Sequence, residues 1–271
     1  MAILTESASI AATRAYRDGE TGILDPDLRA KLYALPQIMA DWLAPFGGFE
    51  GQRVLDFGCG FGETAAGIAL GHGAAEVRGV DIQPKPEGCA GILREHLGLE
   101  ALPVNLNVYQ IEPGAPVGRG DLDIVVSWST VEHVARGLLD GVLGSLHVAL
   151  RPGGLAFIQI SPLYFSPEGS HLWALGYRGW EHLSRQTSEV LEAIEGAPWL
   201  DAKRKARMTR MFLTLNRLTA EELVDRVGKA GFSVLREQRD RTDLVPPHAL
   251  TQAYALEALM TQQVVLLLRR D

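Results

Sequence analysis

Short apolar runs alternate with helix-patterned stretches through the middle of the chain. The runs are apolar at nearly every position, which is typical of strands buried on both faces of a parallel sheet. We expect strands at 53–57, 77–82, 104–109, 124–128 and 155–160, and helices near 63–71, 87–97 and 138–150. This alternation predicts a doubly wound α/β domain.

The carboxyl-terminal part adds two more strands. Thr219 and Glu222 have the spacing of a capping box that begins a helix, and Gly231 follows as a stop signal. Strands are expected at 233–237 and 263–268. The pattern therefore predicts a seven-stranded, mostly parallel, Rossmann-like sheet whose last two strands are consistent with an antiparallel edge.

Two segments fall outside this alternation. Residues 1–50 read as partly amphipathic helices and are expected to form an N-terminal helical lid. Residues 161–217 interrupt the sheet pattern and carry three of the five tryptophans, so we expect a substrate-cap insertion there. The remaining residues, 51–160 and 218–271, would form the cofactor-binding domain.

Composition narrows the class of protein. The 271 residues carry a formal net charge of −7, which argues against nucleic acid as a partner because phosphates call for a basic surface. The first residues lack the basic start and apolar core of a signal peptide, and no apolar run is long enough to span a membrane. We expect a cytoplasmic protein without a membrane partner, and leave a homodimer open.

The stretch "VLDFGCGFGE" carries the first chemical signal. Gly58, Gly60 and Gly62 stand between an expected strand and an expected helix, where missing side chains let a ligand lie against the backbone. Asp81 ends the next strand, 21 residues after Gly60, where a carboxylate can accept hydrogen bonds from ribose hydroxyls. A tight turn without a ligand and an acidic helix cap are the alternatives.

Asp56, just before the glycines, indicates which ligand. A nicotinamide dinucleotide would place its pyrophosphate near this carboxylate, and two unit charges about 4 Å apart interact by roughly 4 kcal/mol at an effective dielectric of 20. A cofactor with an ammonium group turns that repulsion into attraction. S-adenosyl-L-methionine has both an ammonium group and a ribose.

With these residues in view, the sequence resembles the class I S-adenosylmethionine-dependent methyltransferases. The similar motifs are "VLDFGCGFG", "VRGVDIQ", "LDIVVSWSTVEHV" and "LRPGG", the last resembling a turn before the fifth strand. They follow the family's order over about residues 50–160. The resemblance implies a methyltransferase that uses S-adenosylmethionine by direct displacement.

The resemblance also implies further cofactor contacts. Ile82 would flank the adenine, and Ser127 would line the methionine end. Many members have an acidic residue after the third strand, where this chain offers Gln110 or the backbone of Ile111. No carboxylate stands at Ser127–Ser129 for Mg²⁺, and the histidines lack metal-ligand spacing, so no metal is expected.

A base for a hydroxyl acceptor has three candidates. His171 and His182 stand in the aromatic-rich stretch 160–183, and His133 follows the fourth strand in "VEHV". Histidine suits proton transfer because its pKa lies near working pH. Structural hydrogen bonds for the histidines and a hydrophobic core for the aromatics are the alternatives. We rank His171 and His133 ahead of His182.

The leading hypothesis is methyl transfer to an oxygen, hydroxyl or carboxyl, of a small organic acceptor. The alternatives are N-methylation of a small molecule, a non-catalytic partner protein that binds S-adenosylmethionine, and an NAD(P)-dependent oxidoreductase. A basic run at 203–210 indicates a solvated helix face, or else a surface that attracts an anionic acceptor.

Overall fold

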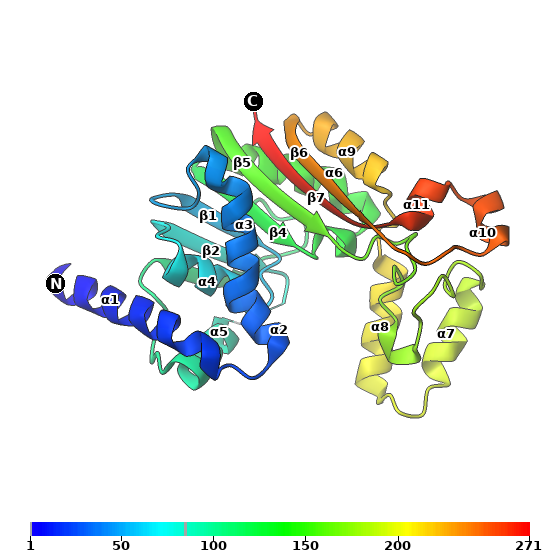
Figure 1. Ribbon diagram of the computed structural model, residues 1–271, viewed down its shortest axis with the longest axis horizontal. Coiled ribbons are helices and arrows are strands. Elements are labelled where there is room, and N and C mark those ends of the chain that lie inside the picture. Colours follow the sequence, from blue (N-terminus) through cyan, green and yellow to red (C-terminus); the bar gives the residue numbers. More distant parts are fainter. Residues whose placement is uncertain (1, 84–85) are drawn as a thin grey trace. The chain divides into compact units, whose positions relative to one another are not determined.

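The computed structural model describes residues 2–83 and 86–271. Its seven strands form one mixed, mostly parallel sheet in the order β3-β2-β1-β4-β5-β7-β6, as predicted (Figure 1). The strands are β1 Arg53–Phe57, β2 Glu76–Asp81, β3 Leu106–Gln110, β4 Leu122–Trp128, β5 Leu150–Ile160, β6 Phe232–Arg241 and β7 Thr261–Arg270.

The helices alternate with these strands. The α-helices are α1 Ala2–Gly19, α2 Pro26–Arg29, α3 Leu35–Leu43, α4 Glu63–Gly71, α5 Pro86–Leu97, α6 Arg136–Ala149, α7 Thr187–Glu195, α8 Ala202–Thr214, α9 Ala220–Lys229, α10 His248–Ala253 and α11 Leu256–Met260. The shorter turns are η1 Glu20–Gly22, the π-helical η2 Ala30–Ala34, η3 Ala44–Phe46, η4 Val131–His133 and η5 Trp173–Leu175. The predicted capping box is present, since Thr219 and Glu222 exchange hydrogen bonds at the start of α9.

Strand β1 is paired in parallel with both β2 and β4. Val54 lies opposite Val77 of β2 and Ile124 of β4, and all three side chains are buried. This burial on both faces explains why the strands are apolar throughout. Because the three strands are parallel, their carboxyl ends meet at one edge, where Phe57 and Asp81 stand.

The start of β5 differs from the prediction. The "LRPGG" segment was expected as a turn before the strand, but α6 ends at Ala149 and the strand begins at Leu150. Gly154 explains why an extended chain fits there: a Cβ would stand 2.9 Å from the Arg151 carbonyl oxygen and 3.1 Å from that of Asp123. Only glycine allows the backbone so close to β4.

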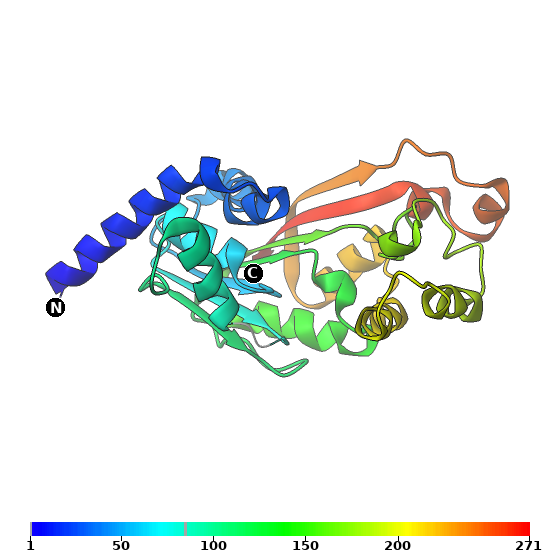
Figure 2. The ribbon, with the colours of Figure 1, turned by 90° about the horizontal axis from the view of Figure 1, so that it is seen from below.

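The chain divides into two compact units. Unit 1 comprises residues 1–128, 145–157 and 269–271, and unit 2 comprises 129–144 and 158–268. In unit 1, α1 contacts α4 and α5, and α3 contacts α4. Figure 2 shows α1 and α3 on the same side of β1 and β2. The lid and cap functions expected for 1–50 and 161–217 stay predictions.

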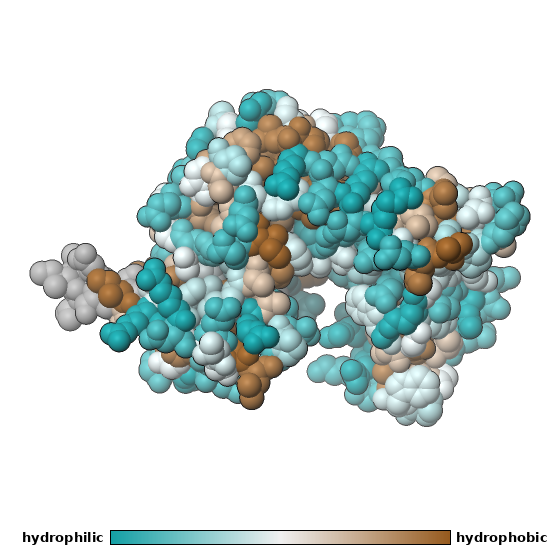
Figure 3. Space-filling view, viewed as in Figure 1, coloured by the Kyte–Doolittle hydropathy of each residue, from teal (hydrophilic) through white to brown (hydrophobic). Residues whose placement is uncertain are grey.

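Unit 2 has a hydrophobic core of its own around α7 and α8. The core residues are Tyr164, Leu172, Tyr177, Val190, Ile194, Ala197, Leu200, Met208, Phe212 and Leu215. The basic run lies on α8, whose Met208 and Phe212 face this core while Lys203, Arg204, Arg207 and Arg210 are exposed. The surface mixes hydrophilic and hydrophobic residues (Figure 3), and among the described residues no helix is long and apolar enough to cross a membrane.

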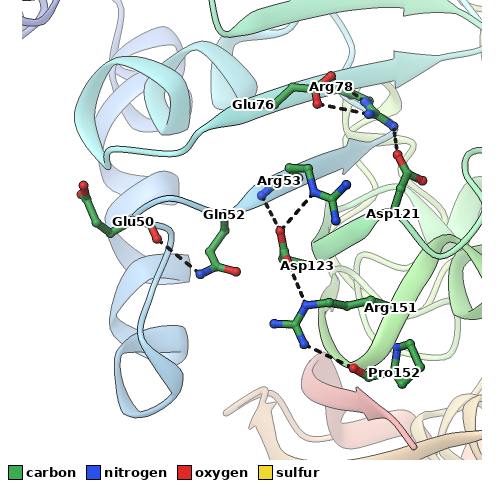
Figure 4. Close-up of polar contacts among 9 residues, drawn as sticks. All are labelled: Glu50, Gln52, Arg53, Glu76, Arg78, Asp121, Asp123, Arg151 and Pro152. Atoms are coloured by element: carbon green, nitrogen blue, oxygen red, sulfur yellow. Dashed lines mark hydrogen bonds and ion pairs between the residues drawn. The ribbon is translucent and has the colours of Figure 1, made fainter.

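A charged network ties together the amino-terminal ends of the strands in unit 1 (Figure 4). Asp123 of β4 accepts a 2.8 Å hydrogen bond from the backbone N–H of Arg53 and a 2.6 Å hydrogen bond from the Arg151 guanidinium. Arg78 of β2 bonds Glu76 and Asp121. These contacts lie at the opposite end of the strands from Phe57 and Asp81.

Candidate active site

The glycine turn joins β1 to α4 in the way the sequence predicts. Gly58, Gly60 and Gly62 have φ angles of 78°, 59° and 92°, which are left-handed and favour glycine. The backbone N–H groups of Gly58 and Cys59 donate to the Val80 carbonyl at 2.8 and 3.0 Å. The turn is therefore fastened to β2, and its helix begins at Glu63.

Two of these glycines are required for different reasons. A Cβ on Gly62 would stand 2.9 Å from Val108 Cγ2 and 3.2 Å from Cys89 Sγ, so packing excludes a side chain there. A Cβ on Gly60 would meet nothing within 4 Å. The open space beside Gly60 leaves its backbone accessible, which is what a bound cofactor needs.

Asp81 lies beside the turn. Its Oδ2 accepts a 3.0 Å hydrogen bond from the Gly60 N–H, and its Oδ1 accepts a 2.8 Å hydrogen bond from the Gln83 N–H. A carboxylate has about four acceptor positions, so two remain for hydroxyl groups of a ribose. The structure thus brings the two sequence signals, the glycines and Asp81, into direct contact.

Asp56 is buried, with 3% of its surface exposed, and its Oδ2 has no hydrogen-bond partner. Burial, together with the nearby carboxylates of Glu63 and Asp81, raises the pKa of Asp56 to about 7, against the lowering effect of the Ala65 N–H. A buried carboxylate that has one oxygen without a partner and lies near two other carboxylates fits a cationic group. An ammonium would satisfy Oδ2 and favour the ionised form.

Glu63 is a second buried carboxylate here, which the sequence reasoning missed. It is 6% exposed, and its Oε1 lies 3.6 Å from Lys31 Nζ. Its place as the first residue of the helix after the glycines was the available signal, since acidic residues are common in a first turn.

The expected adenine and methionine residues stand at the same strand ends. Ile82 is 54% exposed, and its carbonyl accepts a 2.9 Å hydrogen bond from the Gln110 side chain. The Ile111 N–H donates to the Asp81 carbonyl at 2.9 Å. Ser127 is fully buried, and its hydroxyl donates to the Phe57 carbonyl at 3.0 Å, so it joins β4 to β1. Their contacts with a cofactor stay predictions.

Two of the candidate histidines, both in unit 2, lie side by side. The ring centroids of His133 and His171 are 4.8 Å apart at an interplanar angle of 67°. His171 is buried, has a φ of 58°, and its Nε2 lies 3.3 Å from the Pro162 carbonyl oxygen. Burial and the neighbouring His133 lower the pKa of His171 to about 3, so its ring is neutral at pH 7.

His133 is the more accessible of the pair, and partial burial lowers its pKa. His182 lies apart from both. Its Nε2 is 2.7 Å from the Tyr164 carbonyl oxygen, and burial lowers its pKa to about 4. The contact with Tyr164 supports the structural alternative for His182.

Glu132, beside His133, was also missed. It is 3% exposed, and neither carboxylate oxygen has a hydrogen-bond partner. Burial raises the pKa of Glu132 to about 8, and the nearby backbone N–H groups of Glu132 and Ser161 offset only part of that rise, since neither makes a hydrogen bond of normal geometry to the carboxyl group. The buried Asn216 holds this segment in place. Its side chain donates to the Val131 carbonyl oxygen at 2.6 Å, and its backbone N–H donates to the Glu132 carbonyl oxygen at 3.1 Å.

The aromatics of the stretch 160–183 serve mainly as core. Tyr164 and Tyr177 pack in the α7–α8 core, and Trp180 packs with Leu250 and Leu259. Trp173 stays 41% exposed, and its indole N–H donates to Glu168 at 2.9 Å. The structural alternative given for these aromatics is thus the one observed for three of them.

Comparison with known proteins identifies the family and the fold. A family model described as "Methyltransferase domain" matches residues 32–237. Among solved structures, a putative sarcosine dimethylglycine methyltransferase from Galdieria sulphuraria matches with a TM-score of 0.56 and 13% identity over 88% of this chain and 84% of that one. An S-adenosylmethionine-dependent methyltransferase from Mesorhizobium loti matches with a TM-score of 0.52 and 18% identity over 87% of this chain and all of that one.

Curated relatives share more sequence. A ubiquinone biosynthesis O-methyltransferase of Dechloromonas aromatica is 31% identical over 56% of this chain and 61% of its own length. One from Xanthomonas campestris is 30% identical over 62% of this chain and 69% of its own. The chain spans between about half and three fifths of the length of the first three relatives that it matches.

Proposed function

Because the chain belongs to the methyltransferase family whose model matches residues 32–237, we propose that it methylates an oxygen of a small organic acceptor. The protein is an S-adenosylmethionine-dependent methyltransferase, and S-adenosylmethionine supplies an electrophilic methyl group on a sulfonium. The oxidoreductase alternative falls away with this assignment. The finer assignments, namely the acceptor, the residues that hold the donor and the base, are proposals.

The observation that carries the donor site is the buried Asp56, whose Oδ2 has no hydrogen-bond partner. We assign Asp56 to the ammonium of the donor and Asp81 to its ribose hydroxyls. Gly60 admits the donor against the backbone, and Gly58 and Gly62 hold the left-handed turn that presents it. Ile82 and the Gln110–Ile111 segment are assigned to the adenine, and Ser127 to the methionine end.

An oxygen acceptor has two supports. The curated relatives are named O-methyltransferases. An oxygen acceptor must also lose a proton to become a good nucleophile, and unit 2 carries neutral histidines suited to take it. His133 is the favoured base among the three candidates, because its side chain is exposed whereas those of His171 and His182 are buried.

The test is a turnover assay with matched acceptors. The protein is incubated with S-adenosylmethionine and with pairs of phenols, carboxylic acids and amines of similar size, and S-adenosylhomocysteine formation is followed. We expect turnover with hydroxyl or carboxyl compounds, and a methyl ester or ether in the product by mass spectrometry. N-methylated products alone would contradict the oxygen assignment and favour the N-methyltransferase alternative.

The base is tested on the acceptor that this assay identifies. His133→Gln should lower kcat by about 10²-fold or more while leaving the Kd for S-adenosylhomocysteine unchanged. His182→Gln is the matched control, since it removes a buried imidazole that contacts the Tyr164 carbonyl instead of the His133–His171 pair. Equal kcat values for the two variants would remove His133 from this role.

A further inference from the structure

Three side chains that the donor site does not use come together in unit 2. Glu132 and His133 belong to the turn η4, and His171 comes from the loop after β5. One ligand atom from each lies within 4.8 Å of the others. We propose that Glu132, His133 and His171 form a binding site for a divalent first-row transition metal ion such as Zn²⁺.

The carboxylate gives the first support. Glu132 is 3% exposed, and both of its oxygens lack a hydrogen-bond partner. A polar group buried without a partner is costly, and no Lys or Arg is paired with Glu132 among the ion pairs of the described residues. A cation between Glu132 and the two imidazoles would give its oxygens a partner.

The second support is the state of His171. A carbonyl oxygen can only accept a hydrogen bond, so the 3.3 Å contact with the Pro162 carbonyl places the ring hydrogen on Nε2. This leaves the lone pair on Nδ1. Histidine ligands commonly donate their other ring N–H to a backbone carbonyl in this way, which fixes the tautomer that binds the ion.

The backbone around the cluster is also held. Asn216 donates hydrogen bonds of 2.6 and 3.1 Å to the carbonyl oxygens of Val131 and Glu132. His171 has the left-handed φ of 58°, which costs a non-glycine residue about 1 kcal/mol or more and persists only where the surroundings impose it. Both ends of the cluster are therefore positioned by contacts outside it.

The ligand set indicates the class of ion. Two imidazole nitrogens and one carboxylate oxygen suit zinc and ferrous iron, whereas Mg²⁺ prefers oxygen ligands throughout. Ligand atoms about 2 Å from a tetrahedral ion lie roughly 3.4 Å apart, so atoms that are now up to 4.8 Å apart would approach by up to about 1.4 Å on binding. Three protein ligands leave a coordination position for water or for an acceptor oxygen.

The spacing of these residues in the sequence does not predict a metal site. Glu132 and His133 are adjacent, but His171 follows them only after a helix and a strand. Ion binding at this cluster is not part of the proposed function. It can be measured without methyl donor or acceptor, so the two proposals can fail independently. His133 can act as the proposed base only in the ion-free protein. With an ion bound, its imidazole is a ligand, and the ion would lower the pKa of a bound hydroxyl, which would then release its proton to solvent water.

The experiment is a titration of the untagged, chelator-treated chain with Zn²⁺ by calorimetry, and with Co²⁺ by visible absorption. We expect one equivalent to bind, with a Co²⁺ spectrum of nitrogen and oxygen ligands. Glu132→Gln and His171→Gln should each weaken binding by at least about 10-fold. His182→Gln, which removes a buried imidazole outside the cluster, should bind as the unchanged chain does.

Two results would overturn the proposal. One is the absence of saturable Zn²⁺ and Co²⁺ binding to the unchanged chain. The other is equal Zn²⁺ affinity of the Glu132→Gln and His171→Gln variants and the unchanged chain, with each variant shown to be folded by circular dichroism. Millimolar Mg²⁺ should not displace Co²⁺, and displacement at that concentration would contradict the nitrogen ligands. None of these readouts depends on the identity of the methyl acceptor.

Discussion

The Gly60 N–H donates a 3.0 Å hydrogen bond to Asp81 Oδ2, and this bond joins the glycine turn after β1 to the end of β2. The same carboxylate accepts from the Gln83 N–H through its other oxygen. Asp81 therefore both shapes the turn and presents acceptor positions toward the place assigned to a ribose.

Replacing Asp81 tests that double role. Asp81→Ala should raise the Kd for S-adenosylhomocysteine by about 10²-fold, since hydrogen bonds to a charged group contribute about 1.5–3 kcal/mol. Calorimetric titration measures it. Asp121→Ala is the control, because this carboxylate binds Arg78 at the opposite end of β2. If both variants bind the ligand equally well, the ribose assignment is wrong.

Asp56 should make the free protein less stable as pH rises. Its pKa is about 7 in the folded chain, above the unfolded value near 3.9, so the stability present below about pH 4 is lost as pH rises toward 7. The loss is at most about 4 kcal/mol. Asp56→Asn should therefore raise Tm more at pH 8 than at pH 5, while weakening donor binding.

Thermal melts of the free protein at the two pH values measure this effect. Asp243→Asn changes an exposed carboxylate and should leave the difference in Tm between the two pH values unaltered. A Tm gain for Asp56→Asn that is no larger at pH 8 than at pH 5 would show that the buried carboxyl is not the source.

The glycines of the turn should separate folding from donor binding. Gly62→Ala places a Cβ 2.9 Å from Val108 Cγ2 at a φ of 92°, so it should destabilise the fold by about 2 kcal/mol or more. Gly60→Ala meets nothing within 4 Å and should cost only about 1–2 kcal/mol for its φ of 59°.

Urea denaturation and calorimetric titration, run on both glycine variants, distinguish the two effects. Gly60→Ala should bind S-adenosylhomocysteine more weakly although the variant remains folded. The reason is that its new methyl group occupies the open space beside the turn. Unchanged affinity in Gly60→Ala would place the donor elsewhere.

Asp123 should matter for stability alone. Burial raises its pKa, but the hydrogen bonds from Arg151 and from the Arg53 N–H outweigh this, so the net pKa is lowered. Its stabilisation is therefore present above the unfolded value near 3.9 and is lost as pH falls through the lower folded value. Asp123→Asn should lower the free energy of unfolding by about 1–2 kcal/mol at pH 7, with no change in donor affinity.

Much of the fold could be predicted from the sequence, because buried parallel strands are apolar on both faces and because a capping box at Thr219 and Glu222 marks the start of α9. The start of β5 could not. Pro152 and two glycines are usual in a turn, and only the close approach of Gly154 to Asp123 explains the extended chain.

The residues assigned to the donor could be selected from the sequence because they stand at the ends of consecutive strands. The histidines could be selected only for their chemistry, because the sequence does not show which of them lie together. The loop after β5 brings His171 next to His133, and the spacing of these two residues in the sequence does not predict that contact. Glu132 was missed because a glutamate in a short polar stretch is usually solvated, and only the folded structure shows its burial.

Strand β1 has only five residues, yet its two ends serve separate purposes. Arg53 belongs to the charged network at the start, and Asp56 stands beside the glycine turn at the finish. Protein engineering can treat these ends as independent. A more stable variant for acceptor screening is best sought around Arg53, where redesign leaves the residues assigned to the donor unchanged.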